Sequence, residues 1–372
     1  MTFKVATLKE AHGVFEVLDQ PMPSLARDGL IVRVELGGVC ATDLHIAHGH
    51  IPGFDYPSTL GHEVCGIVEA VGPAFGEDVR GTTVRAGDRV AVMPATPCGH
   101  CSVCKSGGRY PNCEHWDVIG FSNPDVRPAG GGWGQYIALN SRARVFVSTA
   151  PADNVVLAEP AATPVEGLSR AGFRLGDSVL VQGTGTVGLL AIAAAALGGA
   201  STITAIGGPR RRLEIAREFG ATTTVDVGEI RDVAERKALV LQSSPGGRGF
   251  DLVMECAGVP SAVAEGFGYL SRGGCFVELG HFSDVGAVEI NPYEHFLSRD
   301  ARMVSSSGYT PDSFSRALTL VEKLGSKAER LITHRLPMGR AADAINALQP
   351  SSRWRLDGTE VGKIVIDPWQ ES

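Results

Sequence analysis

Hydrophobic and polar residues alternate in short segments through the first part of the chain. The segments are LIVRVELGGV (30–39), VCGIVEAVG (64–72) and GDRVAVMP (87–94), and Gly or Pro residues lie at or beside their ends. Alternation with a period of two is typical of half-buried strands, and Gly and Pro mark the turns between them. This pattern predicts a compact, mostly β, barrel-like domain.

From about residue 151 the pattern changes to strands that alternate with helices. Short apolar runs that predict strands are DSVLVQ (177–182), STITAIGG (201–208), TTTVDV (222–227), FDLVMECAG (250–258), GGCFVELG (273–280) and ARMVSSSG (301–308). Segments such as LLAIAAAALGG (189–199) and RRRLEIAREFGA (210–221) between them predict helices. Alternating strands and helices form a parallel sheet wound on both faces, so the predicted fold class is α/β.

Composition limits the classes of protein to consider. The 372 residues are 44% hydrophobic and 20% charged, which suits two globular domains. The net charge of −7 gives no basic field for nucleic acid or an anionic membrane. The most apolar run (187–199) is too short to span a bilayer, and the N-terminus lacks the apolar core of a signal peptide. We therefore expect a cytoplasmic protein with no nucleic-acid or membrane partner.

Half of the eight cysteines lie within sixteen residues, at Cys98, Cys101, Cys104 and Cys113. Thiols stay reduced in the cytosol, so such a cluster indicates a metal or catalysis rather than disulfides. Four thiolates can surround one tetrahedral Zn²⁺ and leave no open position, which makes a structural site. Iron–sulfur ligation is the chemical alternative, and four unrelated free thiols are the simplest one.

A glycine-rich segment, Gly183-Thr-Gly185-Thr-Val-Gly188, follows a predicted strand and opens a predicted helix. In this context the glycines allow a tight turn, approach of a pyrophosphate and close packing of the helix on the strand. The anion would bind at the helix N-terminus. The segment predicts a dinucleotide site, and an ordinary tight turn is the alternative.

A second group of metal-binding residue types lies in the β-rich half. Cys40, His62 and Glu63 all lie at predicted strand ends and could supply three zinc ligands with a fourth position open. Taken singly, they could also be a buried thiol, a core histidine and a surface charge.

Several motifs together make the chain resemble the zinc-containing medium-chain dehydrogenase/reductase family of alcohol, sorbitol and threonine dehydrogenases. They are CATDLH, GHEVCGIVEAVG, GDRV, the cysteine cluster, AEP, GTGTVG, ECAG and GKIVIDP, and they span nearly the whole length. The resemblance implies a GroES-like catalytic domain over residues 1–161 and 311–372. It also implies a Rossmann coenzyme domain over residues 162–310.

The resemblance also implies roles for individual residues. Cys40 and His62 correspond to ligands of a catalytic zinc, Glu63 to a carboxylate that enters and leaves its coordination sphere, and Glu159 to the third ligand position. Which carboxylate is the resting ligand stays open.

Thr42 corresponds to the hydroxyl that contacts the substrate oxygen, and His45 to the next group of a proton relay. Asp43 corresponds to the carboxylate that orients the zinc-bound histidine. The four clustered cysteines correspond to a structural zinc site, so two Zn²⁺ per chain are expected. One departure is that eight residues, rather than the usual seven, precede the last cysteine.

The coenzyme is predicted from the end of the second strand of the α/β part, at Gly207. NAD-binding folds usually carry an acidic residue there for the ribose 2′-hydroxyl, whereas this chain continues as GGPRRR. Guanidinium groups suit a 2′-phosphate, so NADP is favoured over NAD. Alternatively, the arginines form a solvated helix start and Gly207 tolerates either coenzyme. The residues expected to contact the coenzyme are Gly183, Gly185, Thr186, Val187, Gly188, Gly207, Gly208, Arg210, Arg211 and Arg212.

The resemblance thus implies reversible hydride transfer between an alcohol, secondary or alicyclic, and NAD(P)⁺, in a homo-oligomer (dimer or tetramer). A polyol or glutathione-adduct (formaldehyde-type) dehydrogenase is the alternative within the enzyme class. A zinc-stabilised nucleotide-binding protein without catalysis is the alternative from another class. The segment HGHIPGFDYP (48–57), Trp116 and Phe121 could line a partly apolar substrate pocket, although packing of a surface loop would explain them equally well.

Overall fold

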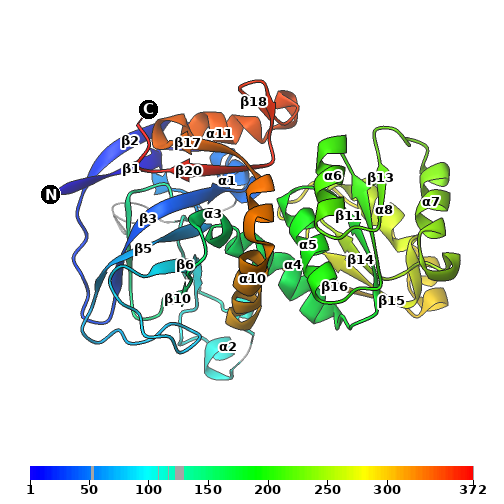
Figure 1. Cartoon of the computed structure of the whole chain (residues 1–372), viewed down its shortest axis with the longest axis horizontal. Helices are drawn as coiled ribbons and strands as arrows, with labels where there is room; N and C mark the ends of the chain where they lie inside the picture. Colours follow the sequence, from blue (N-terminus) through cyan, green and yellow to red (C-terminus); the bar gives the residue numbers. More distant parts are fainter. Residues whose placement is uncertain (52–53, 108, 116, 122–129, 372) are drawn as a thin grey trace. The chain divides into compact units, whose positions relative to one another are not determined.

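The computed structural model describes residues 1–51, 54–107, 109–115, 117–121 and 130–371. The chain forms two compact units, Met1–Glu159 together with Thr310–Ser372, and Pro160–Tyr309. The chain therefore leaves the first unit, builds the second and returns, so that both ends belong to the first unit (Figure 1).

The first unit is built mainly from antiparallel strands. Its larger sheet has the order β10-β6-β5-β3-β20-β17, and β9 pairs with β3. These strands are β3 (Leu30–Val39), β5 (Val64–Val71), β6 (Arg89–Met93), β9 (Tyr136–Leu139), β10 (Arg144–Val147), β17 (Ile332–Pro337) and β20 (Lys363–Asp367). A smaller sheet contains β1 (Thr2–Leu8), β2 (Phe15–Pro21) and β4 (Ser58–Thr59). The three strands predicted from alternation correspond to β3, β5 and β6.

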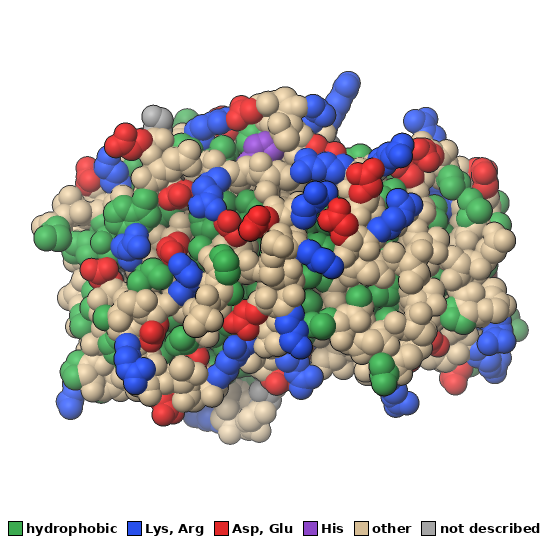
Figure 2. Space-filling model, viewed as in Figure 1, with side chains coloured by type: hydrophobic (Ala, Val, Ile, Leu, Met, Phe, Trp, Pro, Cys, Tyr) green, Lys and Arg blue, Asp and Glu red, His purple; other side chains and the backbone are tan. Residues whose placement is uncertain are grey.

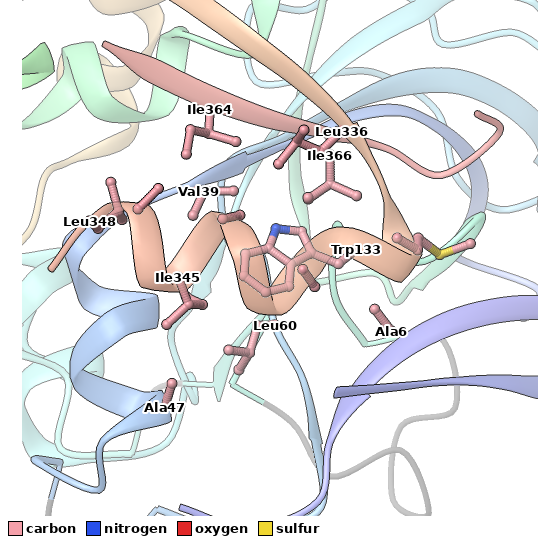
Figure 3. Close-up of a cluster of buried hydrophobic side chains, with 14 of the residues drawn as sticks. Ala6, Val39, Ala47, Leu60, Trp133, Leu336, Ile345, Leu348, Ile364 and Ile366 are labelled. Atoms are coloured by element: carbon pink, nitrogen blue, oxygen red, sulfur yellow. The ribbon is translucent and has the colours of Figure 1, made fainter. Parts of the chain in front are cut away.

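A buried tryptophan joins segments that are far apart in the sequence. Trp133 is fully buried and lies among Val39, Leu60 and Ile366 (Figure 3). Its indole Nε1–H donates to the carbonyl oxygen of Gly38 at 3.1 Å. Helix α11 (Ala341–Ala347) and strand β20, from the C-terminal segment, complete this core around it. The β-rich unit thus depends on residues 310–372 for part of its core.

The second unit is a six-stranded sheet of order β13-β12-β11-β14-β15-β16, and every neighbouring pair is parallel. The strands are β11 (Ser178–Gln182), β12 (Thr202–Gly207), β13 (Thr223–Asp226), β14 (Phe250–Glu255), β15 (Leu270–Glu278) and β16 (Arg302–Ser305). This order is that of the Rossmann fold, in which ligands bind beyond the carboxyl ends of the strands where the order reverses, here between β11 and β14. The predicted α/β class is confirmed.

Helices connect these strands and pack on the sheet (Figure 1). They are α5 (Thr186–Leu197), α6 (Arg210–Glu218), α7 (Val233–Gln242) and α8 (Pro260–Phe267), while α4 (Ala158–Ala171) leads into the unit. Helix α5 is almost entirely apolar, and seven of its residues are buried, which explains the apolar run seen in the sequence. Across the described residues, no helix is both long and apolar enough to cross a membrane.

The surface carries both signs of charge. On the face drawn in Figure 2, Lys and Arg side chains are interspersed with Asp and Glu. This face therefore shows no broad field of one sign.

Candidate metal and coenzyme sites

The clustered cysteines lie around one position. The sulfur atoms of Cys98, Cys101, Cys104 and Cys113 all lie within 4.8 Å of one another. Cys98 Sγ is 4.0 Å from Cys104 Sγ, and Cys101 Sγ is 3.9 Å from Cys113 Sγ. A tetrahedral Zn²⁺ with Zn–S bonds of about 2.3 Å requires sulfur separations of about 3.8 Å. The sulfurs therefore fit a single zinc ion, and the additional residue before Cys113 does not displace its sulfur.

Backbone amides stabilise the sulfurs as thiolates. The N–H of Cys101 donates to Cys98 Sγ at 3.3 Å, and that of Cys104 donates to Cys101 Sγ at 3.4 Å. Backbone N–H groups of Glu114 and Cys104 lower the pKa of Cys101 to about 6. Burial and hydrogen bonds with neighbouring sulfurs raise the pKa of Cys104 to about 12. The amide N–H groups therefore favour thiolates in the cluster, and neighbouring negative sulfurs favour a cation between them.

A second group of donors lies at the end of β3 and the start of β5. Cys40 is the N-cap of helix α1 (Ala41–Ala47), and His62 and Glu63 directly precede β5. One ligand atom from each of the three lies within 4.8 Å of the others. The turn that presents His62 includes Gly61, whose φ of 91° is in the left-handed region. A Cβ there would lie 2.4 Å from Cδ1 of Trp133, so only glycine fits between this turn and the core.

The buried carboxylate of Asp43 connects these residues. Its Oδ2 accepts the N–H of Cys40 at 2.8 Å, and its Oδ1 lies 3.4 Å from the N–H of Gly61 and 3.5 Å from Nδ1 of His62. Burial acts to lower the pKa of His62, but the contacts with Asp43 and Cys40 and the charge of Glu159 raise it well above its usual value. The field at His62 is therefore negative and suits a cation.

Glu63 forms an ion pair with a residue to which the sequence analysis gave no role. Lys363, at the start of β20, is 3% exposed, and its Nζ donates to Glu63 Oε1 at 2.5 Å and to the carbonyl oxygen of Val39 at 2.8 Å. Burial acts to lower the pKa of Lys363, but the charges of Glu63, Cys40 and Glu159 raise it. The only signal in the sequence was the lysine of the GKIVIDP motif, 300 residues from its partner.

The expected relay residues lie on helix α1. Thr42 is buried, and its Oγ1 is 3.7 Å from Cys40 Sγ. His45 is three residues further along the same helix, and residues at this spacing share a helix face. Nδ1 of His45 is 3.4 Å from Nδ1 of His50.

Aromatic side chains lie next to His62. The ring of Phe121 is 5.5 Å from that of His62, and Phe54 packs on Phe121 at 6.1 Å. Both residues belong to the segments expected to line an apolar pocket. Pro52, Gly53 and Trp116 of that expectation lie outside the described residues.

The glycine-rich turn has the expected strand–turn–helix form between β11 and α5. Gly183 has φ of 95°, and a Cβ there would lie 2.8 Å from the backbone of Ala257. A Cβ at Gly188 would lie 1.9 Å from the carbonyl oxygen of Gly183, whereas a Cβ at Gly185 would meet no atom within 4 Å. Thr186 and Val187 form the first turn of α5. Two glycines thus provide close packing, and the middle one faces open space at a helix N-terminus.

Strand β12 ends at Gly207, as expected. A Cβ on Gly207 would lie 2.4 Å from Thr184 Oγ1, which also bonds with the backbone of Gly208 at 3.1 Å. Arg210, Arg211 and Arg212 begin helix α6. Arg210 is exposed and lies 3.5 Å from the Glu214 carboxylate.

The sequence analysis missed an acidic residue near this position. Asp226 ends the neighbouring strand β13, opposite Gly207. Its Oδ1 accepts the N–H of Gly228 at 2.8 Å and would lie 3.5 Å from a Cβ on Gly208. Asp226 was missed because the acidic residue that binds the ribose is usually found at the end of β12. Asp226 ends β13, and only the order of strands in the sheet places β13 next to β12.

A third group of metal-binding residue types, Glu255, Glu278 and His281, was not predicted. Glu255 accepts the N–H groups of Ala257 and Gly258, and Glu278 Oε1 accepts those of Gly280 and His281 and lies 2.9 Å from His281 Nδ1. Burial and the charge of Glu278 raise the pKa of Glu255 to about 7. These carboxylates hold the turns after β14 and β15 in place.

The chain matches known families and proteins along most of its length. The family model "Alcohol dehydrogenase GroES-like domain" matches residues 26–152, and "Zinc-binding dehydrogenase" matches residues 186–323. A 5-exo-hydroxycamphor dehydrogenase of Pseudomonas putida is 31% identical over 93% of this chain and 95% of its own length. A sorbitol dehydrogenase of Halalkalibacterium halodurans is 30% identical over 92% of this chain and 96% of its own.

Solved structures agree with the fold. An alcohol dehydrogenase from Thermotoga maritima superposes with a TM-score of 0.91, at 25% identity over 99% of both chains. A zinc-binding dehydrogenase from Sinorhizobium meliloti, bound to NADP, has a TM-score of 0.82 at 29% identity, covering 99% of this chain and 100% of its own. This chain therefore belongs to the zinc-dependent medium-chain dehydrogenase/reductase family and is a nicotinamide-dependent alcohol dehydrogenase.

Proposed function

We propose that the substrate is a secondary or alicyclic alcohol, oxidised reversibly to a ketone. The observation that carries this proposal is the aromatic side of the metal site, where Phe121 lies 5.5 Å from His62 and packs on Phe54. An apolar wall favours a hydrocarbon ring or chain next to the reacting carbon. The relative named for hydroxycamphor, an alicyclic alcohol, supports this choice.

A polyol is the second candidate, because several relatives are named as polyol dehydrogenases, including the sorbitol dehydrogenase. A polyol has a hydroxyl on each carbon, and a site for it has to pair them with polar groups. The aromatic contacts of His62 favour the apolar substrate.

For the catalytic zinc we propose Cys40, His62 and Glu159 as resting ligands. The carboxylate of Glu63 is held by the buried ammonium of Lys363, whereas Glu159 lies close enough to raise the pKa of His62. Zinc supplies Lewis acidity at such a site and makes an alcohol hydroxyl more acidic. Asp43 fixes the orientation of His62 and the start of α1, which keeps the ligands in place.

We assign Thr42 and His45 to proton transfer. Thr42 lies beside Cys40 and can accept a proton from the substrate hydroxyl as it donates its own. His45 is on the same helix, and an imidazole can accept this proton and release it to water. The four thiolates of Cys98, Cys101, Cys104 and Cys113 would hold a second, structural zinc.

For the coenzyme we propose NADP over NAD, bound at the turn Gly183–Gly188. No acidic residue lies at the end of β12, and arginines begin α6 next to it. The NADP-bound relative supports the choice. Asp226 is nearby, at the end of the neighbouring strand β13, and its Oδ1 accepts the N–H of Gly228. We place the enzyme in the cytoplasm, since all eight cysteines are free.

We also propose that the protein is a homo-oligomer that associates through the edge strand β16. Met303 on this strand is 40% exposed, and Tyr293 and Leu297 just before it are 68% and 76% exposed. Large apolar groups beside an open strand edge favour pairing with a second copy.

Sedimentation velocity should show that the wild-type protein is a dimer or a larger species. The double variant Met303→Lys with Leu297→Glu should dissociate it, and a monomeric wild-type protein would contradict the proposal.

The metal sites predict two zinc ions per chain with different roles. Cys40→Ser should lose one zinc and lower kcat for cyclohexanol by at least about 100-fold, because even residues behind a metal ligand affect activity by 10–100-fold. Cys101→Ser should mainly lower the unfolding temperature, because the closed site stabilises the fold. Elemental analysis measures the zinc content, and a screen of primary, secondary, cyclic and polyhydric alcohols measures the activity. Iron with sulfide, or a single zinc per chain in the wild-type protein, would refute the proposal of two zinc sites. A higher kcat/KM for sorbitol than for cyclohexanol would refute the proposed substrate class.

The ion pair of Glu63 and Lys363 predicts which carboxylate binds zinc at rest. Glu63→Gln should keep two zinc ions per chain, and Glu159→Gln should lose the catalytic one. Lys363→Met should lower the free energy of unfolding by about 3–5 kcal/mol, because it leaves a buried carboxylate unpaired, and Glu63→Gln in the same chain should recover part of this loss.

Urea denaturation and zinc analysis measure these effects. Because the folded pKa of Lys363 is raised above 10.5, its contribution is complete at lower pH and disappears only as the pH rises beyond that value. Zinc loss in Glu63→Gln but not in Glu159→Gln would reverse the assignment of the two carboxylates.

The arginines of α6 predict the coenzyme preference. The wild-type kcat/KM should be higher with NADP, and Arg210→Ala with Arg211→Ala should lower it by about tenfold or more for NADP only, since each pairs with a 2′-phosphate that NAD lacks. Arg217→Ala, at the other end of α6, is the control. A preference for NAD that the double variant leaves unchanged would show that the coenzyme assignment is wrong.

A further inference from the structure

Three backbone turns pack against one another at the carboxyl edge of the parallel sheet. They are the glycine-rich turn after β11, the turn of residues 256–258 after β14, and the turn after β15. A Cβ on Gly183 would lie 2.8 Å from the backbone nitrogen of Ala257, and a Cβ on Gly258 would lie 2.6 Å from the carbonyl oxygen of Gly280. The middle turn is therefore packed closely between the other two, at the point between β11 and β14 where dinucleotides bind in this fold.

The side chain of Glu255 shapes the middle turn. Glu255 ends β14 and has no exposed surface. Its Oε1 accepts the N–H groups of Ala257 at 2.7 Å and Gly258 at 2.9 Å, and its Oε2 lies 3.2 Å from the second of these nitrogens. A Cβ on Gly280 would overlap Oε2, so the carboxylate also packs on the third turn. Glu255 thus fixes the backbone that packs against Gly183.

Charged groups face Glu255 from the side of β15. His281 Nδ1 lies 2.9 Å from Oε1 of Glu278 and 3.5 Å from Oε2 of Glu255. On the side of β11, the neighbour of Glu255 is Gln182, which is uncharged. Helix α5 carries no charged side chain, and the single charged residue of α8 pairs with Arg236. The charge of Glu255 is therefore balanced mainly against Glu278 and His281.

Glu255 gains or loses a proton near neutral pH. Burial, and then the charge of Glu278, raise its pKa to about 7, although the N–H groups of the turn and His281 act in the opposite direction. The neighbouring thiol of Cys256 does not titrate in this range, because burial and the charges of Glu255 and Glu278 raise its pKa well above its usual value.

We propose that Glu255 is a positioning residue for the coenzyme, whose carboxylate holds the turn of residues 256–258 against the glycine-rich turn and whose protonation weakens coenzyme binding. This rests on the proposed binding of the coenzyme at Gly183–Gly188. A neutral carboxyl group accepts amide hydrogen bonds more weakly than a carboxylate does. Because the coenzyme binds where these turns meet, its binding favours the carboxylate, and the displaced proton passes to solvent. Release of the coenzyme takes up one proton.

Fluorescence titration of the zinc-loaded enzyme with NADH tests this between about pH 6 and pH 8. NADH is the probe because it lacks the 2′-phosphate, a group that itself titrates near pH 6. A hydrogen bond to a charged group corresponds to about tenfold in affinity, which for a group titrating near pH 7 gives about a fivefold rise of Kd from pH 8 to pH 6. Glu255→Gln should bind NADH about tenfold more weakly than wild type at pH 8, with a Kd that changes little with pH.

Two further variants sharpen the test. Glu278→Gln removes a negative charge next to Glu255, so the midpoint of the pH profile should move to lower pH. This shift tests the proposal even if Glu255→Gln does not fold. Asp251→Asn is the matched control, since Asp251 is near the other end of β14 and accepts the N–H of Ser178 at 2.8 Å. It should keep the wild-type Kd and pH profile.

The variant Gly185→Val separates this inference from the proposed coenzyme site. A Cβ on Gly185 meets no atom within 4 Å, so the valine fits the fold and occupies the space proposed for the pyrophosphate. Unchanged NADH affinity in Gly185→Val would overturn the coenzyme site and the inference together. Lost affinity in Gly185→Val with a wild-type profile in Glu255→Gln would overturn the inference alone. Weak binding in Glu255→Gln with a flat profile in wild type would show a merely structural role, and a midpoint that Glu278→Gln leaves in place would also contradict the proposal.

Discussion

The candidate metal site at Cys40 and His62 depends on the buried carboxylate of Asp43. It bonds the N–H of Cys40 at the start of α1 and lies within 3.5 Å of Gly61 and His62 at the start of β5. Two segments that are not paired as strands at this point are thereby fixed to each other. Burying a carboxylate as fully as that of Asp43 costs free energy unless polar groups surround it. The polar groups that surround Asp43 include the backbone of Cys40 and the ring of His62, so the arrangement that stabilises Asp43 also brings the thiol and the imidazole together. The same interaction sets the negative field that favours a cation.

Packing behind the site adds a second constraint. Trp133 leaves no room for a Cβ on Gly61, and its indole bonds with Gly38, next to the strand end that leads to Cys40. Residues from β20 complete the core and also supply Lys363. The return of the chain to its first unit therefore contributes both apolar packing and a buried positive charge, which balances Glu63 beside the metal donors.

Local patterns were enough to predict most of the fold, whereas the roles of Cys40, His62 and Glu63 came from the resemblance of several motifs to a family and stay predictions. The strands β3, β5 and β6, the turn Gly183–Gly188 and the end of β12 at Gly207 follow from periodicity and glycines within a few residues. The cysteine cluster was recognisable because its four cysteines lie within sixteen residues, whereas Cys40 and His62 are far apart in the sequence and were assigned through the family motifs that contain them. Lys363, Asp226 and the contact of His50 with His45 were not assigned a role. The first two depend on pairing between distant strands, and the third on the exact end of a seven-residue helix.

Three groups of donors in the described residues look alike by residue type, and their other hydrogen bonds distinguish them. Amide N–H groups of the same loop donate to the sulfurs of Cys98, Cys101 and Cys113, and the four sulfurs of the cluster lie around one position. Beside Cys40 and His62, the amides of Cys40 and Gly61 donate to Asp43 rather than to the thiol, and the ammonium of Lys363 holds the carboxylate of Glu63. At Glu255 and Glu278 the oxygens are taken up by the turns after β14 and β15. The first two groups therefore remain the candidate metal sites, whereas the third stabilises the backbone at the edge of the sheet where dinucleotides bind in this fold.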